Sequence, residues 1–194
     1  MKLNNEEKVV LRILKNCSVE YNANSISKVL GLTPMGSLKL LRRLEEQKII
    51  ILRRVSNIKF YNFNFENQYA KDYVSLILRK EADNCSAFVK RWVGEIRKIG
   101  IAEGAIIFGS VLRDDKSARD IDVLFVVDKK NFGRLRKKIE KINTISEKKI
   151  HPVYQSGKDL LKNLKNRDKV VLEIIRGLVV SGEKKFVDLL EVAR

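Results

Sequence analysis

The chain has 194 residues, with 44% hydrophobic and 33% charged side chains and a formal net charge of +16 at neutral pH. This composition indicates a globular protein of one or two domains with hydrophobic cores. Two cysteines, Cys17 and Cys85, exclude a disulfide framework and favour a reducing compartment. The apolar runs are of strand length and the first residues do not read as a signal peptide, so we expect no membrane span and a cytoplasmic location.

Positive charge is spread along the chain, because both the first 65 residues and the remainder are basic. Such a charge favours a polyanionic partner, whether DNA, RNA or a nucleotide. A lysine-rich solvated surface would account for the composition equally well. The nature of the partner therefore has to come from motifs rather than from composition.

Three segments near the N-terminus carry apolar residues at helical spacing: residues 5–16, 25–30 and 34–48. Gly31 can end the second helix in a left-handed conformation. Thr33 is a favourable N-cap for the third helix, and Pro34 fits its first turn. We expect Met35, Leu38, Leu41 and Leu44 on the buried side of this third helix.

Two strand-like runs follow, residues 49–55 and 58–65. Aromatic residues alternate with asparagines in the second run, as the period of a strand requires. The runs are joined by Ser56-Asn57, and asparagine tolerates a positive φ angle. The sequence therefore predicts a tight hairpin with basic side chains on it.

This order of helix, short helix, three-residue turn, longer helix and basic hairpin resembles a winged helix-turn-helix domain over residues 3–65. The resemblance is carried by residues 25–33 and 41–50. It implies that the longer helix enters the DNA major groove and that the hairpin, or wing, touches the backbone. By position, the DNA contacts would be Ser37, Lys39 and Arg43 on the helix and Arg53, Arg54 and Lys59 on the wing.

Lysine and arginine at these positions are expected to contact phosphates, which positions a protein without specifying sequence. Winged-helix proteins often act as dimers on two-fold sites, so a homodimer is one expectation. The alternative is that this domain serves protein contacts or dimerisation rather than DNA binding.

The pattern of residues 66–99 predicts one or two connecting helices. We expect Trp92 to pack in the core or at a domain interface and not to bind a ligand. After Gly100, strands and helices alternate, with Gly182 as a helix breaker. The expected strands are residues 104–109, 121–127 and 150–155, and the expected helices are residues 131–143, 157–165, 168–180 and 183–193. The predicted fold is α+β: a winged helix over 1–65, connecting helices over 66–99, and a mixed α/β domain with C-terminal helices over 100–194.

The most informative motif lies between the first two strands of this last domain. The first strand stops at Gly109-Ser110, and after nine further residues the second begins with Asp120-Ile121-Asp122. Carboxylates at i and i+2 of a strand share a face, and two like charges held so close are costly without a cation between them. Mg²⁺ takes oxygen ligands and keeps positions open for phosphate oxygens, while a Gly-Ser turn offers N–H groups and a hydroxyl to a polyphosphate.

The spacing and the apolar flanks resemble the nucleotidyltransferase superfamily of DNA polymerase beta type, over about residues 85–160. The minimal nucleotidyltransferases, some of them antitoxins, and the kanamycin nucleotidyltransferase group are the most similar. The resemblance implies transfer of a nucleoside monophosphate from a nucleoside triphosphate to an acceptor. Asp120 and Asp122 would bind Mg²⁺ and act in catalysis, and Gly109 and Ser110 would hold the triphosphate.

The sequence departs from that family on the third strand, where active members usually carry another carboxylate. The strand reads Lys-Ile-His-Pro-Val-Tyr, and His151, the single histidine of the chain, stands at the expected position. Its imidazole could act as a catalytic base, although it suits Mg²⁺ poorly as a ligand. The alternative is that His151 has no role in catalysis and is simply a polar residue at the end of a strand. Asp128 is expected to cap the next helix, and Asp114 and Asp115 to remain solvated.

Two further alternatives stay open. Asp122 could pair with Arg113 or Arg119 and Asp120 could cap a turn, in which case the acids are structural. At the level of function, the main reading is a Mg²⁺-dependent nucleotidyltransferase that carries a DNA-binding winged helix. The alternative is a DNA-binding transcriptional regulator or antitoxin, with a toxin or other protein partner, whose transferase domain is degenerate, inactive or senses nucleotide.

Overall fold

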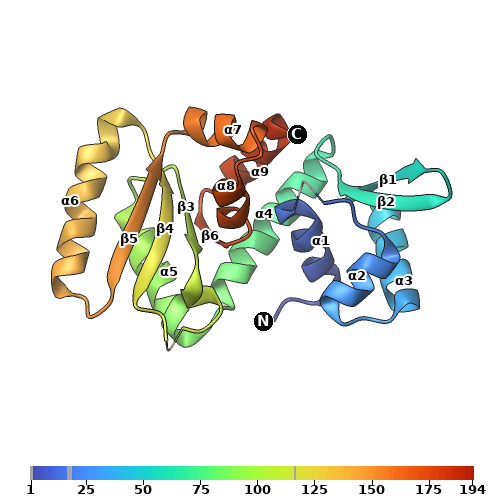
Figure 1. Ribbon diagram of the computed structural model, residues 1–194, viewed down its shortest axis with the longest axis horizontal. Coiled ribbons are helices and arrows are strands. Elements are labelled where there is room, and N and C mark those ends of the chain that lie inside the picture. The colour runs from blue at the N-terminus through green and yellow to red at the C-terminus, as the bar shows by residue number, and fades with distance from the viewer. Residues whose placement is uncertain (1, 17–18, 116) are drawn as a thin grey trace. The chain divides into compact units, whose positions relative to one another are not determined.

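The computed structural model describes residues 2–16, 19–115 and 117–194. The chain forms two compact units, one that ends at Ile77 and one that runs from Leu78 to Arg194 (Figure 1). The division falls within helix α4 (Gln68–Asp83). Cys85 is a free thiol, whereas Cys17 lies outside the described residues. None of the helices in the described residues is long and apolar enough to cross a membrane.

The first unit is a winged helix-turn-helix, as the sequence predicts. Its elements are α1 (Asn5–Lys15), α2 (Ala23–Leu30), α3 (Pro34–Glu46), β1 (Ile50–Val55) and β2 (Ile58–Phe63). Gly31 ends α2 with a φ angle of 65°, in the left-handed region that favours glycine. The Thr33 hydroxyl accepts a hydrogen bond of 3.0 Å from the Gly36 N–H, which caps α3.

The wing is a tight antiparallel hairpin in which Val55 lies opposite Ile58. The turn residue with a positive φ angle is Ser56, at 52°, and not the asparagine that follows it. The predicted hairpin is therefore confirmed, but the residue that adopts the positive φ angle is Ser56 and not Asn57. Tyr21 forms an antiparallel bridge with Tyr61, so the segment before α2 also pairs with the hairpin.

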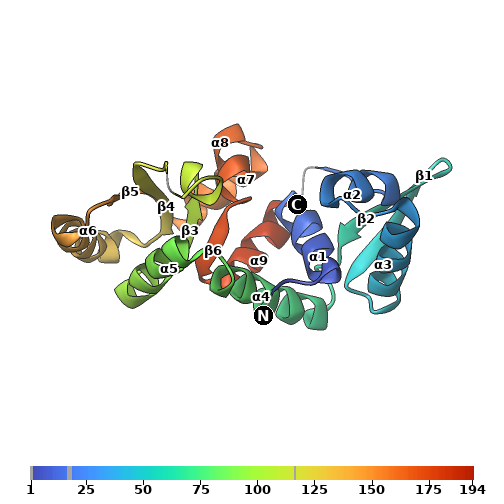
Figure 2. The ribbon, with the colours of Figure 1, turned by 90° about the horizontal axis from the view of Figure 1, so that it is seen from below.

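The second unit contains one four-stranded sheet with helices on both faces (Figures 1 and 2). Its elements are α5 (Ala87–Ile99), β3 (Gly104–Phe108), the 3₁₀ turn η1 (Ser110–Leu112), β4 (Asp120–Val126), α6 (Lys129–Ile145), β5 (Lys149–Gln155), α7 (Gly157–Lys165), α8 (Lys169–Ile174), β6 (Leu178–Ser181) and α9 (Glu183–Ala193). The strand order is β5-β4-β3-β6. β4 and β5 are parallel and joined through α6, while the other pairs are antiparallel. This mixed α/β domain with C-terminal helices completes the predicted α+β fold.

Two local expectations are wrong in this unit. The sequence predicts one helix over residues 168–180, but the helix stops at Ile174 and residues 178–181 form the edge strand β6. The structure places Gly177 so close to β3 that a Cβ there would lie 2.3 Å from the Ile107 carbonyl oxygen. Asp128 does stand at the N-cap of α6, but its side chain makes no capping hydrogen bond.

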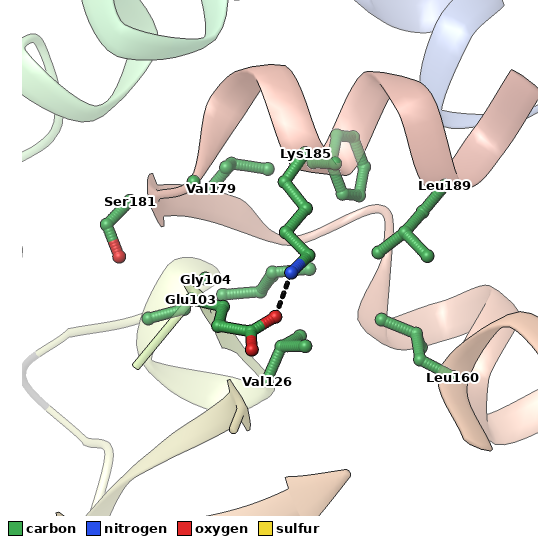
Figure 3. Close-up of a pocket in the computed structure, with 12 residues that line it drawn as sticks. Glu103, Gly104, Val126, Leu160, Val179, Ser181, Lys185 and Leu189 are labelled. Atoms are coloured by element: carbon green, nitrogen blue, oxygen red, sulfur yellow. Dashed lines mark hydrogen bonds and ion pairs between the residues drawn. The ribbon is translucent and has the colours of Figure 1, made fainter. Parts of the chain in front are cut away.

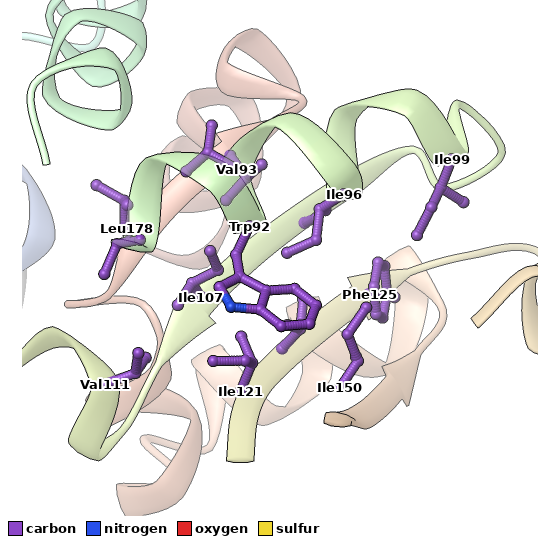
Figure 4. Packing of buried hydrophobic residues seen from close by; sticks show 14 of the residues in the cluster. Trp92, Val93, Ile96, Ile99, Ile107, Val111, Ile121, Phe125, Ile150 and Leu178 are labelled. Atoms are coloured by element: carbon purple, nitrogen blue, oxygen red, sulfur yellow. The ribbon is translucent and has the colours of Figure 1, made fainter. Parts of the chain in front are cut away.

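The main core of the second unit lies between one face of the sheet and helices α5 and α6. Figure 4 shows the part of this core under α5. Trp92 of α5 is 5% exposed and packs there against residues of β3 and β4, which confirms its predicted core role. Ile121, Val123 and Phe125 of β4 all point into this core. Because side chains alternate along a strand, Asp120 and Asp122 must lie on the opposite face.

Candidate functional site

Asp122 is the centre of a small polar group on the second unit's sheet. In the register of the strands it lies beside Phe108 of β3 on one side and beside His151 of β5 on the other. Ile121 is fully buried, so it fixes which face the two flanking aspartates occupy. The fold thus brings Asp120, Asp122 and His151 to one end of the same sheet face, from positions about thirty residues apart in the chain.

Gly109 allows the chain to pass very close to the Asp122 carboxylate. Its φ and ψ angles are 82° and −154°, a backbone conformation that side-chain-bearing residues rarely adopt. A Cβ atom at this position would lie 2.4 Å from Oδ2 of Asp122. The Gly-Ser turn and the second aspartate of the motif, which eleven residues separate in the chain, are therefore direct neighbours in space.

His151 holds one oxygen of that carboxylate. Its Nδ1 atom lies 3.1 Å from Oδ1 of Asp122, and the side chains are 73% and 30% exposed, respectively. The acid therefore pairs with the histidine and not with Arg113 or Arg119, the alternatives that the sequence left open. Lys149, beside Asp120 in the register, instead donates a 2.8 Å hydrogen bond to the Ser146 carbonyl.

The donor set suits a hard cation only in part. Asp120 and Asp122 offer carboxylate oxygens on one face, and the described residues provide no lysine or arginine that pairs with either acid. Within the same residues, no group of three or more histidine, cysteine or acidic side chains could hold a metal ion. Two carboxylates on one face are fewer protein ligands than a Mg²⁺ ion held by protein alone would need.

Two cavities of the second unit are not lined by Asp120, Asp122 or His151. One hollow of about 400 Å³ is bounded by the start of α5 and by the loop that begins with η1, including Ser86, Val111 and Arg113. Asp115, expected to be solvated, is half-buried in its wall and accepts a hydrogen bond from Ser86. Asp114 is exposed, as expected. Ser110, at the start of η1, is exposed too.

A second cavity lies under α9, between that helix and strands β3 and β6 (Figure 3). It is lined largely by apolar side chains and is closed at one side by the ion pair of Glu103 with Lys185. Its volume is about 10 Å³, barely enough for one water molecule. It is a packing defect in the fold and not a ligand site.

The exposed face of α3 differs from the face that the sequence predicts. Ser37 is fully buried, so its expected contact with DNA is wrong. It lies four and seven residues before Leu41 and Leu44, and this spacing places all three on the core face. Met35, expected in the core, is 63% exposed.

The basic residues of α3 fall into two groups. Lys39 and Arg42 are exposed and have no hydrogen-bond or ion-pair partner in the described part of the chain. Arg43 is exposed as well, but its guanidinium lies 2.9 Å from the Glu6 carboxylate of α1. Arg42 was not among the predicted contacts, although its position three residues after Lys39 on the same helix face would have identified it.

The wing carries three of the predicted DNA contacts. One of these cations has a carboxylate partner within the chain, and the other two do not. Arg53 forms an ion pair with Glu20. Arg54 and Lys59 lie directly opposite each other across the hairpin, and both are exposed. Like charges in that arrangement destabilise a hairpin, and neither side chain has a neutralising partner in the described residues.

Comparison with known proteins gives little beyond the fold. No family model matches the chain, and no curated protein matches it. Among solved structures, the chain is similar to a mutant form of ZitR from Lactococcus lactis, with 14% identity and a TM-score of 0.33 over 52% of this chain. It spans 61% of that ZitR chain. The adhesin competence repressor AdcR from Streptococcus pyogenes is 12% identical, with a TM-score of 0.32 over 50% of this chain and 77% of its own. At these values the similarity identifies neither a family nor an activity.

Proposed function

We propose that the chain is a DNA-binding regulator whose winged helix contacts the duplex through the exposed α3 face and the wing. The observation that carries this proposal is the cross-strand pair of Arg54 and Lys59. Two cations held opposite each other cost stability in the free protein, and a phosphate group between them would remove that cost. Lys39 and Arg42 add two more unpartnered cations on the helix that a winged helix inserts into the major groove.

The test is a salt titration of duplex binding. Replacing Arg54 and Lys59 by glutamine should lower the slope of log K against log salt by about two, because about one counterion is released for each phosphate contact. The matched control is Arg43→Gln with Arg53→Gln, which removes two charges that already have carboxylate partners. We expect a smaller change in slope from this control. Equal slopes for the wild type and the Arg54/Lys59 variant would remove the wing from the DNA interface.

A second proposed activity belongs to the second unit, which would bind a nucleoside triphosphate with Mg²⁺ and transfer its nucleoside monophosphate to an acceptor hydroxyl, with release of pyrophosphate. The close approach of Gly109 to Asp122 supports it, since the approach sets the N–H groups of a tight turn beside a carboxylate that faces the same space. Asp120 and Asp122 would hold the ion, and Gly109 and Ser110 the phosphates. The bound ion would neutralise charge on the phosphate oxygens. His151, held by Asp122, would accept the proton of an acceptor hydroxyl.

Calorimetry with each of the four nucleoside triphosphates tests binding, and a labelled triphosphate tests transfer. Asp122→Asn should abolish the Mg²⁺-dependent part of the binding heat. Asp188→Asn, which makes the same charge change at an exposed position of α9, should leave the binding heat unchanged. Absence of Mg²⁺-dependent binding for all four triphosphates would rule out both the transferase and the nucleotide sensor. Binding without label transfer would favour a regulator that senses nucleotide.

A further inference from the structure

Helix α6 carries a row of four cations on its outer side. Lys130, Arg134, Lys137 and Lys141 recur at intervals of four, three and four residues, and all four are exposed. At 3.6 residues per turn they fall within about 60° of arc around the helix axis. Leu135 and Ile139 are buried on the opposite side of the helix, in the core against the sheet. We call these four residues the α6 stripe.

The stripe has no internal charge compensation. None of its four side chains has a hydrogen-bond or ion-pair partner in the described residues. The other cations of the helix differ in this respect, since Arg136 pairs with Glu140 at 2.9 Å and Lys138 donates to the Ile99 carbonyl at 2.8 Å. The helix thus has both neutralised and unneutralised cations, and the unneutralised ones share one face.

The placement of these charges opposes the stability of the helix itself. Neighbours in the stripe are three or four residues apart, and like charges at those spacings repel. Lys129 and Lys130 occupy the first turn, where the helix dipole disfavours cations, and the last turn has no basic residue. A surface selected for solubility alone would gain from intermixed acids, as in the Arg136–Glu140 pair. An anionic partner outside the chain would offset this repulsion.

The length and regularity of the stripe fit a row of phosphates. From Lys130 to Lys141 the helix rises about 16 Å, at 1.5 Å per residue. One strand of duplex DNA rises about 3.4 Å along the duplex axis for each phosphate but also winds around that axis, so successive phosphates would be reached by the four long side chains of the stripe and not by its straight axis. We propose that the α6 stripe is a second DNA-backbone contact, carried by the second unit and separate from the wing. The choice of DNA as the polyanion rests on the function proposed for the winged helix.

The experiment uses the full chain and a labelled DNA duplex of mixed sequence, followed by fluorescence polarisation across a salt series. Replacing all four stripe residues by glutamine should lower the slope of log K against log salt by about three to four, since about 0.9 is lost per phosphate contact. Near physiological salt the affinity should fall at least about tenfold. Replacing the three stripe lysines by arginine should keep the wild-type slope, because phosphate contacts need the charge and not the lysine itself.

The matched control removes four charges elsewhere in the same unit. Lys158, Lys162, Lys165 and Lys169 of α7 and α8 are exposed, and two of them lie in the last turn of α7, where the dipole favours cations. Their replacement by glutamine should change the slope much less than the stripe variant does. Equal loss of slope in the two variants would mean that total charge, and not the stripe, attracts DNA, and would overturn the inference. An unchanged slope in the stripe variant would overturn it as well.

The same measurements separate this inference from the proposed role of the wing. If the stripe variant loses slope and the Arg54/Lys59 variant does not, the second unit binds DNA and the wing proposal fails. If only the Arg54/Lys59 variant loses slope, the wing proposal stands and the stripe inference fails. A wild-type chain that does not bind duplex DNA at any salt concentration would overturn both.

Discussion

Gly109 illustrates how one residue determines what a site can hold. Its positive φ angle and the 2.4 Å approach of a notional Cβ to Asp122 mean that the turn and the carboxylate exclude any side chain between them. His151 occupies the other side of the same carboxylate. An acid at the histidine position would offer two oxygens to a cation, whereas the imidazole offers one nitrogen, a poor ligand for Mg²⁺. In the proposed transferase site this exchange replaces a third carboxylate by a proton acceptor, and leaves Asp120 and Asp122 as the carboxylates that would hold the ion.

At the same scale, Tyr61 gives a prediction of pH dependence. Burial raises the pKa of its phenol above the usual 10.0, and the nearby Glu45 carboxylate adds to that rise. A raised pKa in the folded state means that the neutral phenol contributes stability, which is fully present below pH 10 and is lost as the pH rises through the raised pKa. Tyr61→Phe should therefore lose less stability than the wild type between neutral pH and pH above 10.

Urea unfolding at neutral and alkaline pH measures this difference. Tyr69→Phe is the control, because Tyr69 is 61% exposed. Its loss of stability on alkalinisation should equal that of the wild type. An identical alkaline loss in the Tyr61 variant would show that ionisation of this phenol does not limit folding at high pH.

At the scale of elements, β6 shows why a short strand can be hidden in a helical pattern. Residues 168–180 have apolar residues that suit a helix, but Gly177 interrupts them, and Leu178, Val179 and Ser181 pair with β3 instead. The edge of β3 is open to a partner at this point, and pairing satisfies its backbone groups. Gly177 is the residue that permits the approach, because its missing side chain leaves room for the Ile107 carbonyl.

Gly177→Ala should therefore destabilise the second unit by about 1–3 kcal/mol, the usual cost of forcing an extra methyl group into a packed site. The control is Gly94→Ala in α5, where a Cβ would meet no atom within 4 Å. There the better helix propensity of alanine should stabilise the protein by up to about 1 kcal/mol. Thermal unfolding of the two variants distinguishes these outcomes. A neutral Gly177→Ala would mean that β6 can move away from β3 at little cost.

At the scale of the whole molecule, the charge of +16 is distributed over two units with separate cores. Each unit carries cations that pair with carboxylates and cations that do not. In the first unit the unneutralised ones include Arg54, Lys59 and Arg42, and in the second they include the α6 stripe. Because both units carry cations without carboxylate partners, we expect both to contribute to the proposed DNA binding and to its steep dependence on salt concentration.

The sequence by itself determined the features that depend on local chemistry. Helix caps such as Thr33 and the left-handed Gly31 follow from backbone preferences, and the alternation of side chains along any strand puts Asp120 and Asp122 on one face. The winged helix and the shared face of the two acids were therefore predictable. The spacing of polar residues in α3 suggested a DNA-facing side, but polarity alone misplaced Ser37.

Only the tertiary structure decided the features that depend on partners far apart in the chain. The pairing of β6 with β3, the contact of His151 with Asp122 and the neutralisation of Arg43 and Arg53 by distant glutamates all arise from packing between elements. No local propensity encodes such contacts, because the free energy that selects them comes from burying whole faces together. For the same reason the number of basic residues is known from the sequence, while the fold decides which of them remain available to an anion.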